Sequence, residues 1–534
     1  NNISVTGASE KHSFYLGMGY SYEQGNIKHE KFSKITLNAS NEYKITDKIK
    51  VGFQFNGARM LPADSKSVLN AVRTTPIAPV FNEEYQLYAA LPEFQKAQMM
   101  NPMVDVDLKA NTTRAENYRA SGNIYGEVDF LEHFNFRAVF SMDYGSNNGR
   151  TYQPIIKVYD NTVKGNVATL GTGKTEVSQF KENETKVQSD YVLTYTNSFG
   201  DHNLTATAGF TTYYNSLSRL DAARGQGIGL VIPDNPDKWF VSIGDLATAT
   251  NGSTQWERTT VSFLGRVIYN YKGKYLFNGS FRRDGSSAFS YTGNQWQNFY
   301  SAGAGWLMTE EEFMKPMTSV LSNGKLRVSF GQTGNSNIGN RAISYYQTGN
   351  NNEFGGTESI GVYLSQMGNP DLKWETTTEW NVGLDLGFFN NRLNVTAEYF
   401  RKVVSDLLAE RSLLTFNEAD KIAANIGKTQ SQGFELTINT TNFNSKDFSW
   451  NTDFTFSFYR DKWNTRDASW KPAAYSQYNA PIRYMYGYLS DGLIQPGETV
   501  DYMPGSLPGQ VKIKDINGYV YNAVSYTHLT LPTN

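Results

Sequence analysis

The sequence contains no cysteine, only 16 prolines and only five histidines among its 534 residues. Without cysteine no disulfide framework is possible, and no two histidines stand at the spacing of zinc ligands. No apolar run reaches the roughly 18 residues of a membrane-spanning helix, and the mean hydropathy is −0.50. The formal net charge of −2 offers no electrostatic basis for binding nucleic acid. These absences exclude a disulfide framework and a helical membrane protein, and they argue against a zinc site.

Two segments that approach catalytic or phosphate-binding motifs are incomplete. "GYSYE" (Gly19–Glu23) lacks the second glycine of a nucleophile elbow. "RGQGIGL" (Arg224–Leu230) has the glycines of a phosphate loop, but no helix-forming segment follows it. We therefore predict neither an enzyme nor a bound cofactor.

The sequence is rich in aromatic residues, 34 Tyr and 32 Phe, and these recur at every second position. In "TTEWNVGLDLGFFNNRLNVTAEYF" (Thr377–Phe400) one side carries only apolar residues and the other mostly polar residues or glycine. A period of two is typical of a β-strand, and Asn-Asn suits a two-residue hairpin loop because asparagine tolerates positive φ. The pattern predicts a hairpin with Phe388 opposite Leu393 and Val382 opposite Tyr399.

The same alternation recurs in roughly 14 to 16 segments, many of about 9 to 13 residues. Strands of globular sheets usually have about 5 to 6 residues, whereas a strand that crosses a bilayer needs about 9 to 11. Short turns alternate with long loops, which we expect at about residues 59–119, 145–186, 215–258, 333–373 and 403–431. One short-side connection, Trp306–Met317, is predicted to carry a helical turn or two.

Charge separates the two faces of these segments. The apolar sides hold no charged residue, whereas the opposite sides hold Lys50, Glu127, Asp129, Arg137, Asp143, Asp385, Glu398 and Asp453. A Lys or Arg on the lipid face at mid-membrane costs about 2–4 kcal/mol. A soluble sandwich would also exclude charge from its core, but its strands would be shorter and its loops would not sort by side. The predicted fold is an all-β, transmembrane antiparallel β-barrel with short periplasmic turns and long extracellular loops.

Candidate site residues lie at strand ends and in long loops. "SFRRDGSS" (Ser280–Ser287) predicts a lumen-facing ion pair; contact with a plug or ligand is the alternative. Loop aromatics could stack on sugar rings or peptide side chains, although loop packing explains them equally well. The candidates for lumen or plug contact are Arg282, Arg283, Asp284, Asp385 and Glu398, and those for substrate binding are Trp239, Trp256, Trp296, Tyr345 and Tyr346.

"KDINGY" (Lys514–Tyr519) begins like a calcium loop, with Asp515 and Asn517 as weak candidate ligands. The later acidic ligands are missing, so a turn is favoured over a metal site.

Several segments together resemble the SusC/RagA family of TonB-dependent outer-membrane importers of Bacteroidota. They are "NPDLKWETTTEWNVGLDLGFFNNRLNVTAEYFRKVVSDLL", "KYLFNGSFRRDGSSAFS", "GWLMTEEEFMK", "KLRVSFGQTGN" and "SQGFELTINT". The first is specific, and the others support it by order and spacing. "PGSLPGQVKIKDINGYV" is similar to a Gly- and Asp-rich family segment, but Tyr519 stands where an Asp is usual.

In that family a signal peptide, a plug domain and a TonB box precede a barrel of about 22 strands. The resemblance implies that residues 1–523 are an internal part of such a barrel. Residues 524–534, "VSYTHLTLPTN", break the pattern, and we interpret them as a non-native tail from sequencing-adapter read-through.

The resemblance further implies a multi-pass protein of the Gram-negative outer membrane, surrounded by lipid and lipopolysaccharide, that imports an oligosaccharide or another large nutrient such as a peptide. Its implied partners are a SusD-like surface lipoprotein that acts as a lid and the TonB-ExbB-ExbD complex. The alternatives are a passive porin or adhesin barrel, and a soluble all-β glycan-binding protein.

Overall fold

The computed structural model describes residues 1–64, 68–96, 99–160, 165–349, 352–414, 419–467, 481–483 and 487–515. The chain forms two compact units. Unit 1 comprises residues 1–197 and 206–265, and unit 2 comprises residues 198–205 and 266–534.

Among the described residues, sixteen mostly long strands form one sheet, in which they follow one another in chain order. This number agrees with the predicted 14 to 16. All the pairings described between them are antiparallel. In unit 1 the strands are β1 (Asn2–Ala8), β2 (His12–Gln24), β3 (Lys31–Thr46), β4 (Ile49–Leu61), β7 (Thr113–Phe130), β8 (Phe134–Gln153) and β11 (Glu176–Phe199). The last two residues of β11 belong to unit 2, and two further strands, β12 (His202–Gly225) and β13 (Thr250–Tyr271), also have residues in both units. Unit 2 contains β14 (Tyr275–Ser286), β15 (Trp296–Leu307), β16 (Leu321–Asn335), β21 (Glu375–Phe388), β22 (Leu393–Ser405), β25 (Gly427–Asn444) and β26 (Ser449–Arg466).

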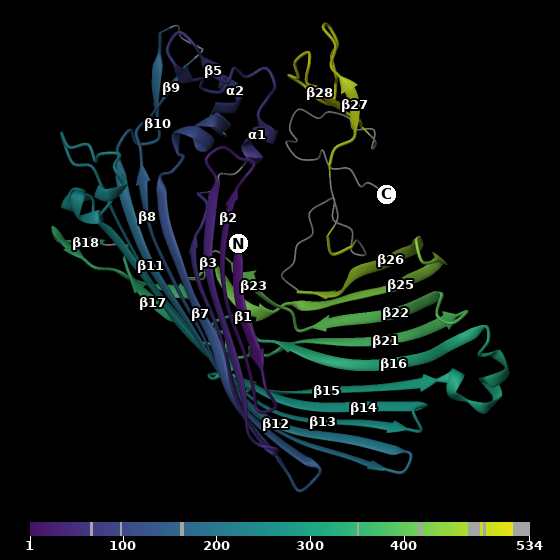
Figure 1. Cartoon of the computed structure of the whole chain (residues 1–534). Coiled ribbons are helices and arrows are strands. Elements are labelled where there is room, and N and C mark those ends of the chain that lie inside the picture. Colours follow the sequence, from purple (N-terminus) through teal and green to yellow (C-terminus); the bar gives the residue numbers. More distant parts are fainter. Residues whose placement is uncertain are drawn as a thin grey trace. The chain divides into compact units, whose positions relative to one another are not determined.

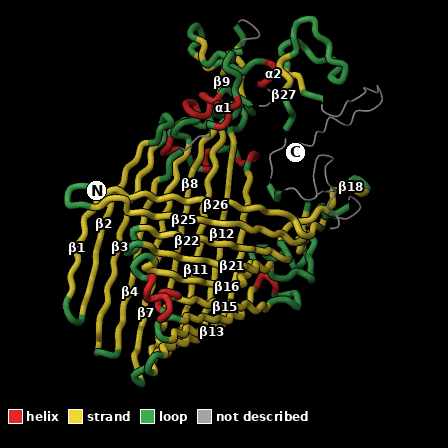
Figure 2. The backbone as a smooth tube through the Cα atoms, turned by 90° about the vertical axis from the view of Figure 1, so that its right-hand side faces the viewer, coloured by secondary structure: helices red, strands yellow, loops and turns green. Residues whose placement is uncertain are grey.

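Short and long connections alternate along most of the chain, as predicted, but the β15–β16 connection (308–320) is longer than the β14–β15 connection (287–295). Figure 1 shows that in unit 1 the small elements of the long connections gather at one end of the strands. Figure 2 shows β1 to β4 side by side in one layer. The small elements of unit 1 are α1 (Leu69–Arg73), α2 (Glu93–Lys96), a π-helical turn (Val104–Leu108), β5 (Phe81–Asn82), β6 (Leu87–Tyr88), β9 (Ile156–Tyr159), β10 (Val167–Leu170) and 3-10 turns at Pro236–Lys238, Val241–Ile243 and Leu246–Thr248.

Most small elements of unit 2 lie in the connections between its long strands, and two short strands follow β26. Two 3-10 turns, Met308–Glu310 and Glu312–Met317, occupy the short-side connection for which the sequence predicted helical turns. The others are a 3-10 turn at Ser287–Phe289 and the strands β17 (Tyr345–Thr348), β18 (Asn352–Phe354), β19 (Thr357–Ser359), β20 (Val362–Gln366), β23 (Leu408–Ser412), β24 (Lys421–Asn425), β27 (Ser490–Leu493) and β28 (Val511–Ile513). Within the described residues, no helix has both the length and the apolar character to cross a bilayer.

The hairpin between β21 and β22 has the predicted register. Phe388 pairs with Leu393, and Val382 pairs with Tyr399. The turn differs in one respect: Phe389 adopts a positive φ of 53°, as do Asn390 and Asn391 at 56° and 60°. The left-handed stretch is therefore one residue longer than the predicted loop.

One face of the sheet, here called the apolar face, is uncovered. Its side chains include Phe140, Trp380 and Phe456, which are 46%, 54% and 48% exposed. The core of a soluble sandwich would bury such residues against a second sheet. An apolar face this extensive requires lipid as its solvent, which agrees with the predicted transmembrane fold and contradicts the soluble alternative. The opposite side is called the polar face.

The strands extend further than predicted, and the long loops are correspondingly shorter. The sequence placed a loop at residues 145–186, but β8 continues to Gln153 and β11 begins at Glu176. Both faces of these extensions are largely polar, so they lack the alternation that marks a strand in lipid. Their ladder hydrogen bonds continue regardless of side-chain type.

Buried apolar clusters lie where the long connections pack on the strand ends. One contains Tyr152, Val177, Ile232 and Trp239. A second surrounds Val104, Ile156 and Val158, and a third, in unit 2, comprises Ala288, Phe289, Phe299, Leu372, Trp374 and Ala423. The long connections are therefore folded structures with cores of their own.

Candidate functional site

The polar face carries pairs of opposite charges at the level of the apolar band. Glu127 on β7 accepts a hydrogen bond from Lys50 Nζ of β4 at 3.2 Å, and Arg137 Nη1 of β8 lies 3.8 Å from its other oxygen. Arg119 Nε donates to Asp143 Oδ1 at 2.9 Å. Facing residues on neighbouring antiparallel strands share a side of the sheet, so these pairs confirm the predicted polar face.

In unit 1 the side chain of Tyr125 on β7 extends over a glycine on the neighbouring strand β4 and contacts a residue on the next strand, β3. Gly52 of β4 pairs with Tyr125 on one side and with Glu42 on the other. The Tyr125 hydroxyl donates to Glu42 Oε2 at 2.6 Å. A Cβ atom at Gly52 would lie 2.5 Å from the Tyr125 ring, so the bridge requires glycine at this position.

Unit 2 contains the same arrangement with an arginine. Arg327 of β16 pairs with Gly383, and Gly383 pairs with Glu398. The Arg327 guanidinium contacts Glu398 across the glycine, and its Nε donates to Asp385 Oδ2 at 3.0 Å. The structure thus brings Asp385 and Glu398 together through one cation that the sequence analysis did not single out. Counting by twos along "KLRVSFGQ" would have placed Arg327 on the polar face.

The segment Arg282–Asp284 confirms one part of its prediction and corrects another. Arg282 Nε donates to Asp284 Oδ1 at 2.7 Å, so the predicted ion pair is present. Arg283 lies on the opposite face, because successive strand residues alternate. There it is on the side of Phe281, and its guanidinium stacks 5.4 Å from the Trp296 ring. The prediction that Arg283 faces the lumen is therefore wrong.

Among the predicted loop aromatics, Trp239 is buried. Its side chain is 1% exposed and stacks on Tyr152 at 5.3 Å, which gives it a packing role instead of an open binding surface. The other four are more exposed: Trp256 on β13 39%, Trp296 on β15 40%, and Tyr345 and Tyr346 on β17 41% and 65%.

The predicted calcium-loop residues are only partly described. Asp515 follows β28, and Asn517 lies outside the described residues. Across the described parts of the chain, no three His, Asp or Glu side chains converge in a way that could hold a metal ion.

One carboxylate joins two long connections of unit 1. Asp107 accepts hydrogen bonds from the Tyr88 hydroxyl at 2.6 Å and from Lys28 Nζ at 2.9 Å, and His29 Nε2 lies 2.7 Å from it. These contacts, with Tyr88 as the largest contribution, hold the pKa of Asp107 well below its usual range. The same hydrogen bond raises the pKa of Tyr88 to about 12. The contact fixes the β2–β3 loop against the β4–β7 connection.

Comparison with known proteins agrees with this architecture. Residues 81–526 match the family described as TonB dependent receptor-like, beta-barrel. TonB-dependent receptor P3 of Formosa agariphila is 28% identical over 474 residues, which cover 86% of this chain and 45% of that protein. TonB-dependent receptor SusC of Bacteroides thetaiotaomicron is 26% identical over 485 residues, covering 86% of this chain and 46% of SusC.

The fold resembles that of the RagAB peptide transporter, with a TM-score of 0.76 and 21% identity over 95% of this chain and 56% of that one. The chain spans about half the length of the curated relatives it matches. These relatives confirm the SusC/RagA resemblance found in the sequence. The chain belongs to the TonB-dependent receptor β-barrel family, whose members are outer-membrane receptors and transporters and not enzymes.

Proposed function

We propose that the intact protein is an outer-membrane, TonB-dependent importer of oligosaccharides or other large nutrients such as peptides. One observation supports this most strongly: a single sheet has an exposed apolar face, an ion-paired polar face and long folded connections. In a barrel the polar face lines the lumen, while the long connections form the extracellular entrance.

The import cycle begins at the long connections. Trp256, Tyr345 and Tyr346 are exposed and offer ring faces on which sugars or peptide side chains can stack. A SusD-like lipoprotein closes over the bound nutrient as a lid. TonB, with ExbB and ExbD, then uses the proton gradient to displace a plug, and the nutrient passes along the polar face.

In this proposal residues 1–523 supply the barrel, and the plug and TonB box belong to other parts of the intact protein. Residues 524–534 remain interpreted as a non-native tail, and they lie outside the described residues. Asp284, Asp385 and Glu398 are proposed to line the lumen. Their ion pairs with Arg282 and Arg327 hold them against the wall of the sheet.

A passive porin is the competing function, and energy dependence separates the two. Uptake of labelled oligosaccharide and peptide pools is measured in source cells with the gene intact or deleted, with and without a protonophore. The proposal expects uptake that requires the gene, the proton gradient and a neighbouring gene for a SusD-like lipoprotein. Gene-dependent uptake that persists after the gradient is dissipated would establish the passive pore instead.

Sequencing the locus across both ends of this chain provides an independent check. The proposal expects a coding region for a signal peptide, plug and TonB box upstream, and barrel coding that continues beyond Val524. A reading frame restricted to these residues would contradict it.

A further inference from the structure

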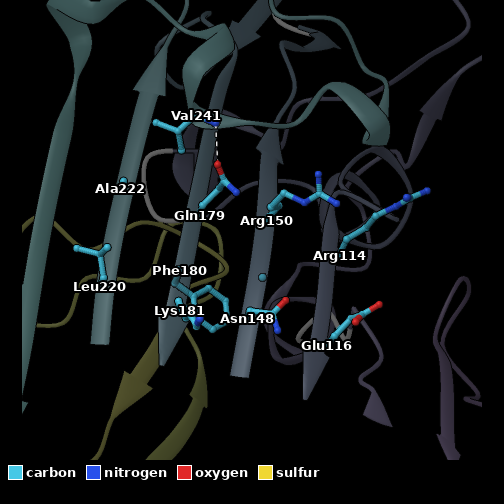
Figure 3. A pocket seen from close by; sticks show the side chains of 11 residues that line it. Arg114, Glu116, Asn148, Arg150, Gln179, Phe180, Lys181, Leu220, Ala222 and Val241 are labelled. Atoms are coloured by element: carbon cyan, nitrogen blue, oxygen red, sulfur yellow. Dashed lines mark hydrogen bonds between the residues drawn. The ribbon is translucent and has the colours of Figure 1, made fainter. Parts of the chain in front are cut away.

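Unit 1 contains a cavity of about 600 Å³ built on four long strands, β7, β8, β11 and β12. Its side chains stand in two rows (Figure 3). Arg114, Arg150 and Gln179 are lateral neighbours in the upper row, and Glu116, Asn148 and Lys181 are lateral neighbours in the lower row. The lining also includes Leu220 and Ala222 of β12, Val241 of the β12–β13 connection, and Gly149 and Phe180, which alternate with the residues of the two rows along β8 and β11.

The two rows lie on the same side of the sheet as the lipid-facing residues. Counting by twos along β8 from Phe140 leads through Met142 and Tyr144 to Asn148 and Arg150, and the pairing with β7 and β11 has no register shift there. Asn148 and Arg150 are about 13 and 20 Å beyond Tyr144 along the strand. With a strand tilt of about 45°, they lie ~9–14 Å above the aromatic edge of the apolar band. The cavity is therefore outside the lumen, on the extracellular side of the lipid boundary.

The β12–β13 connection encloses the upper part of this cavity. Val241 N donates to Gln179 Oε1 at 2.9 Å, and the Arg150 guanidinium stacks 4.5 Å from the Phe240 ring. Next to it, Trp239 stacks on Tyr152, and the Tyr152 hydroxyl donates to the Ile232 carbonyl at 3.1 Å. These contacts hold the β12–β13 connection against the lipid side of the strands, where it forms one wall of the cavity.

The cavity has an excess of positive charge. Its acidic residue, Glu116, is already occupied, because Arg59 Nη2 and the Tyr118 hydroxyl donate to it at 2.8 and 2.6 Å. Among the described residues, the acidic partner of Arg114 is Asp237, an exposed side chain 3.4 Å away. Arg150 Nη1 is buried and has no hydrogen-bond partner among the described residues. A buried cationic donor without an acceptor is costly, and an anion supplies the missing acceptor.

We propose that this cavity binds a phosphate group on the saccharide headgroup of an outer-leaflet glycolipid. Arg114 and Arg150 contact the phosphate oxygens, Lys181 adds a third cation, and Asn148 and Gln179 meet sugar hydroxyls. The height above the apolar band suits a phosphorylated sugar head, because an ordinary phospholipid phosphate lies closer to the acyl chains. The site is on the opposite side of the sheet from the proposed import path, so it does not depend on that function.

Binding is tested on the intact receptor in nanodiscs. The probes are purified rough-type lipopolysaccharide, the same glycolipid with its phosphates removed, and inorganic phosphate. Native mass spectrometry measures how much of each remains bound. The variants are the Arg114→Ala/Arg150→Ala pair and Arg150→Lys, which retains the charge. Arg283→Ala is the matched control, because Arg283 is an arginine on the lipid side that lies outside this cavity. Heat-dependent gel mobility verifies that each variant has folded.

The proposal expects the wild type to bind the phosphorylated glycolipid at least about tenfold more tightly than the dephosphorylated form, a difference of about 1.4 kcal/mol. The double variant loses this preference, Arg150→Lys keeps part of it, and Arg283→Ala keeps it in full. If the wild type retains both glycolipids equally, the proposed phosphate-binding site is refuted. Equal losses in the double variant and in Arg283→Ala show unspecific attraction and also overturn it. Displacement of the glycolipid by inorganic phosphate at comparable concentration assigns the cavity to a soluble phosphate, which refutes the glycolipid.

Discussion

Placing an arginine at Phe140 tests whether the apolar face of β8 contacts lipid. Tyr144 lies ten residues beyond Phe134 on this strand, a distance of about 33 Å along the chain. At a tilt of about 45° this corresponds to ~23 Å along the membrane normal, close to the ~25 Å apolar band of outer-membrane barrels. Phe140 lies one residue from the midpoint, or ~2 Å from the midplane on this scale.

The expected loss of stability follows from this depth. An arginine at the midplane costs about 2–4 kcal/mol. Phe140 is 46% exposed within the sheet, so about half of its ring faces lipid. Losing that contact adds ~1 kcal/mol, half of the value for a fully transferred aromatic side chain. Phe140→Arg should therefore destabilise the folded barrel by about 3–5 kcal/mol.

The neighbouring residue provides a matched control. Ser141 lies on the polar face between Asn123 and Gln188, so Ser141→Arg should cost no more than about 1 kcal/mol. Both variants are made in the intact receptor, folded into lipid vesicles and unfolded with guanidinium while tryptophan fluorescence is recorded. Equal losses in the two variants, or a stable Phe140→Arg protein, would refute the assignment of the faces.

Outcomes are expected for four further variants. Arg327→Ala leaves two carboxylates without their shared cation and should cost about 1–2 kcal/mol in the same unfolding assay, because the partners are partly solvated. Gly383→Leu should cost a similar amount by displacing that guanidinium; unchanged stability in both variants would remove the bridge as a stabilising feature. Trp239→Ala should make the β12–β13 connection sensitive to limited proteolysis without unfolding the barrel; lost uptake with an unchanged cleavage pattern would instead indicate substrate contact. Its contacts lower the pKa of Asp107 in the folded state below that in the unfolded state. The ionised carboxylate therefore stabilises the fold at pH values above the ordinary aspartate pKa. This contribution is lost as the pH falls toward the folded-state pKa. The stability difference between wild type and Asp107→Asn should therefore shrink as the pH falls from about 5 to about 3, and a constant difference would contradict the role of its contacts.

Alternation predicted the membrane-crossing part of the fold because lipid imposes it on every second residue. The pairing of Val382 with Tyr399 could be read from the sequence for that reason. A slip of one residue would turn the whole apolar side of β22 away from that of β21, so a single register satisfies both strands. The number of long strands followed from the same pattern.

Strand ends and loop cores could not be predicted in this way. Beyond Tyr144 both faces of β8 are largely polar. The backbone hydrogen bonds that continue the strand to Gln153 do not require alternating side chains, so the sequence pattern does not indicate them. Trp239 illustrates the same limit, since its burial depends on Tyr152 and Ile232, which are distant in sequence. Arg283 was assigned to the wrong face although counting by twos from Phe281 separates it from Arg282.

The two glycine bridges connect the fold to the proposed cargo. Because Gly52 and Gly383 have no side chain, a residue on one neighbouring strand can reach over the glycine to the strand on its other side. In this way Tyr125 binds Glu42, and Arg327 binds Glu398. The Tyr125 hydroxyl binds Glu42 without neutralising its charge, and the single cation of Arg327 is shared by two carboxylates, Asp385 and Glu398. Both bridges therefore hold carboxylates close to the sheet, where their oxygens are already engaged in hydrogen bonds. A polar face of hydrogen-bonding groups held against the strands suits the passage of polar molecules, which agrees with the proposed oligosaccharide or peptide cargo.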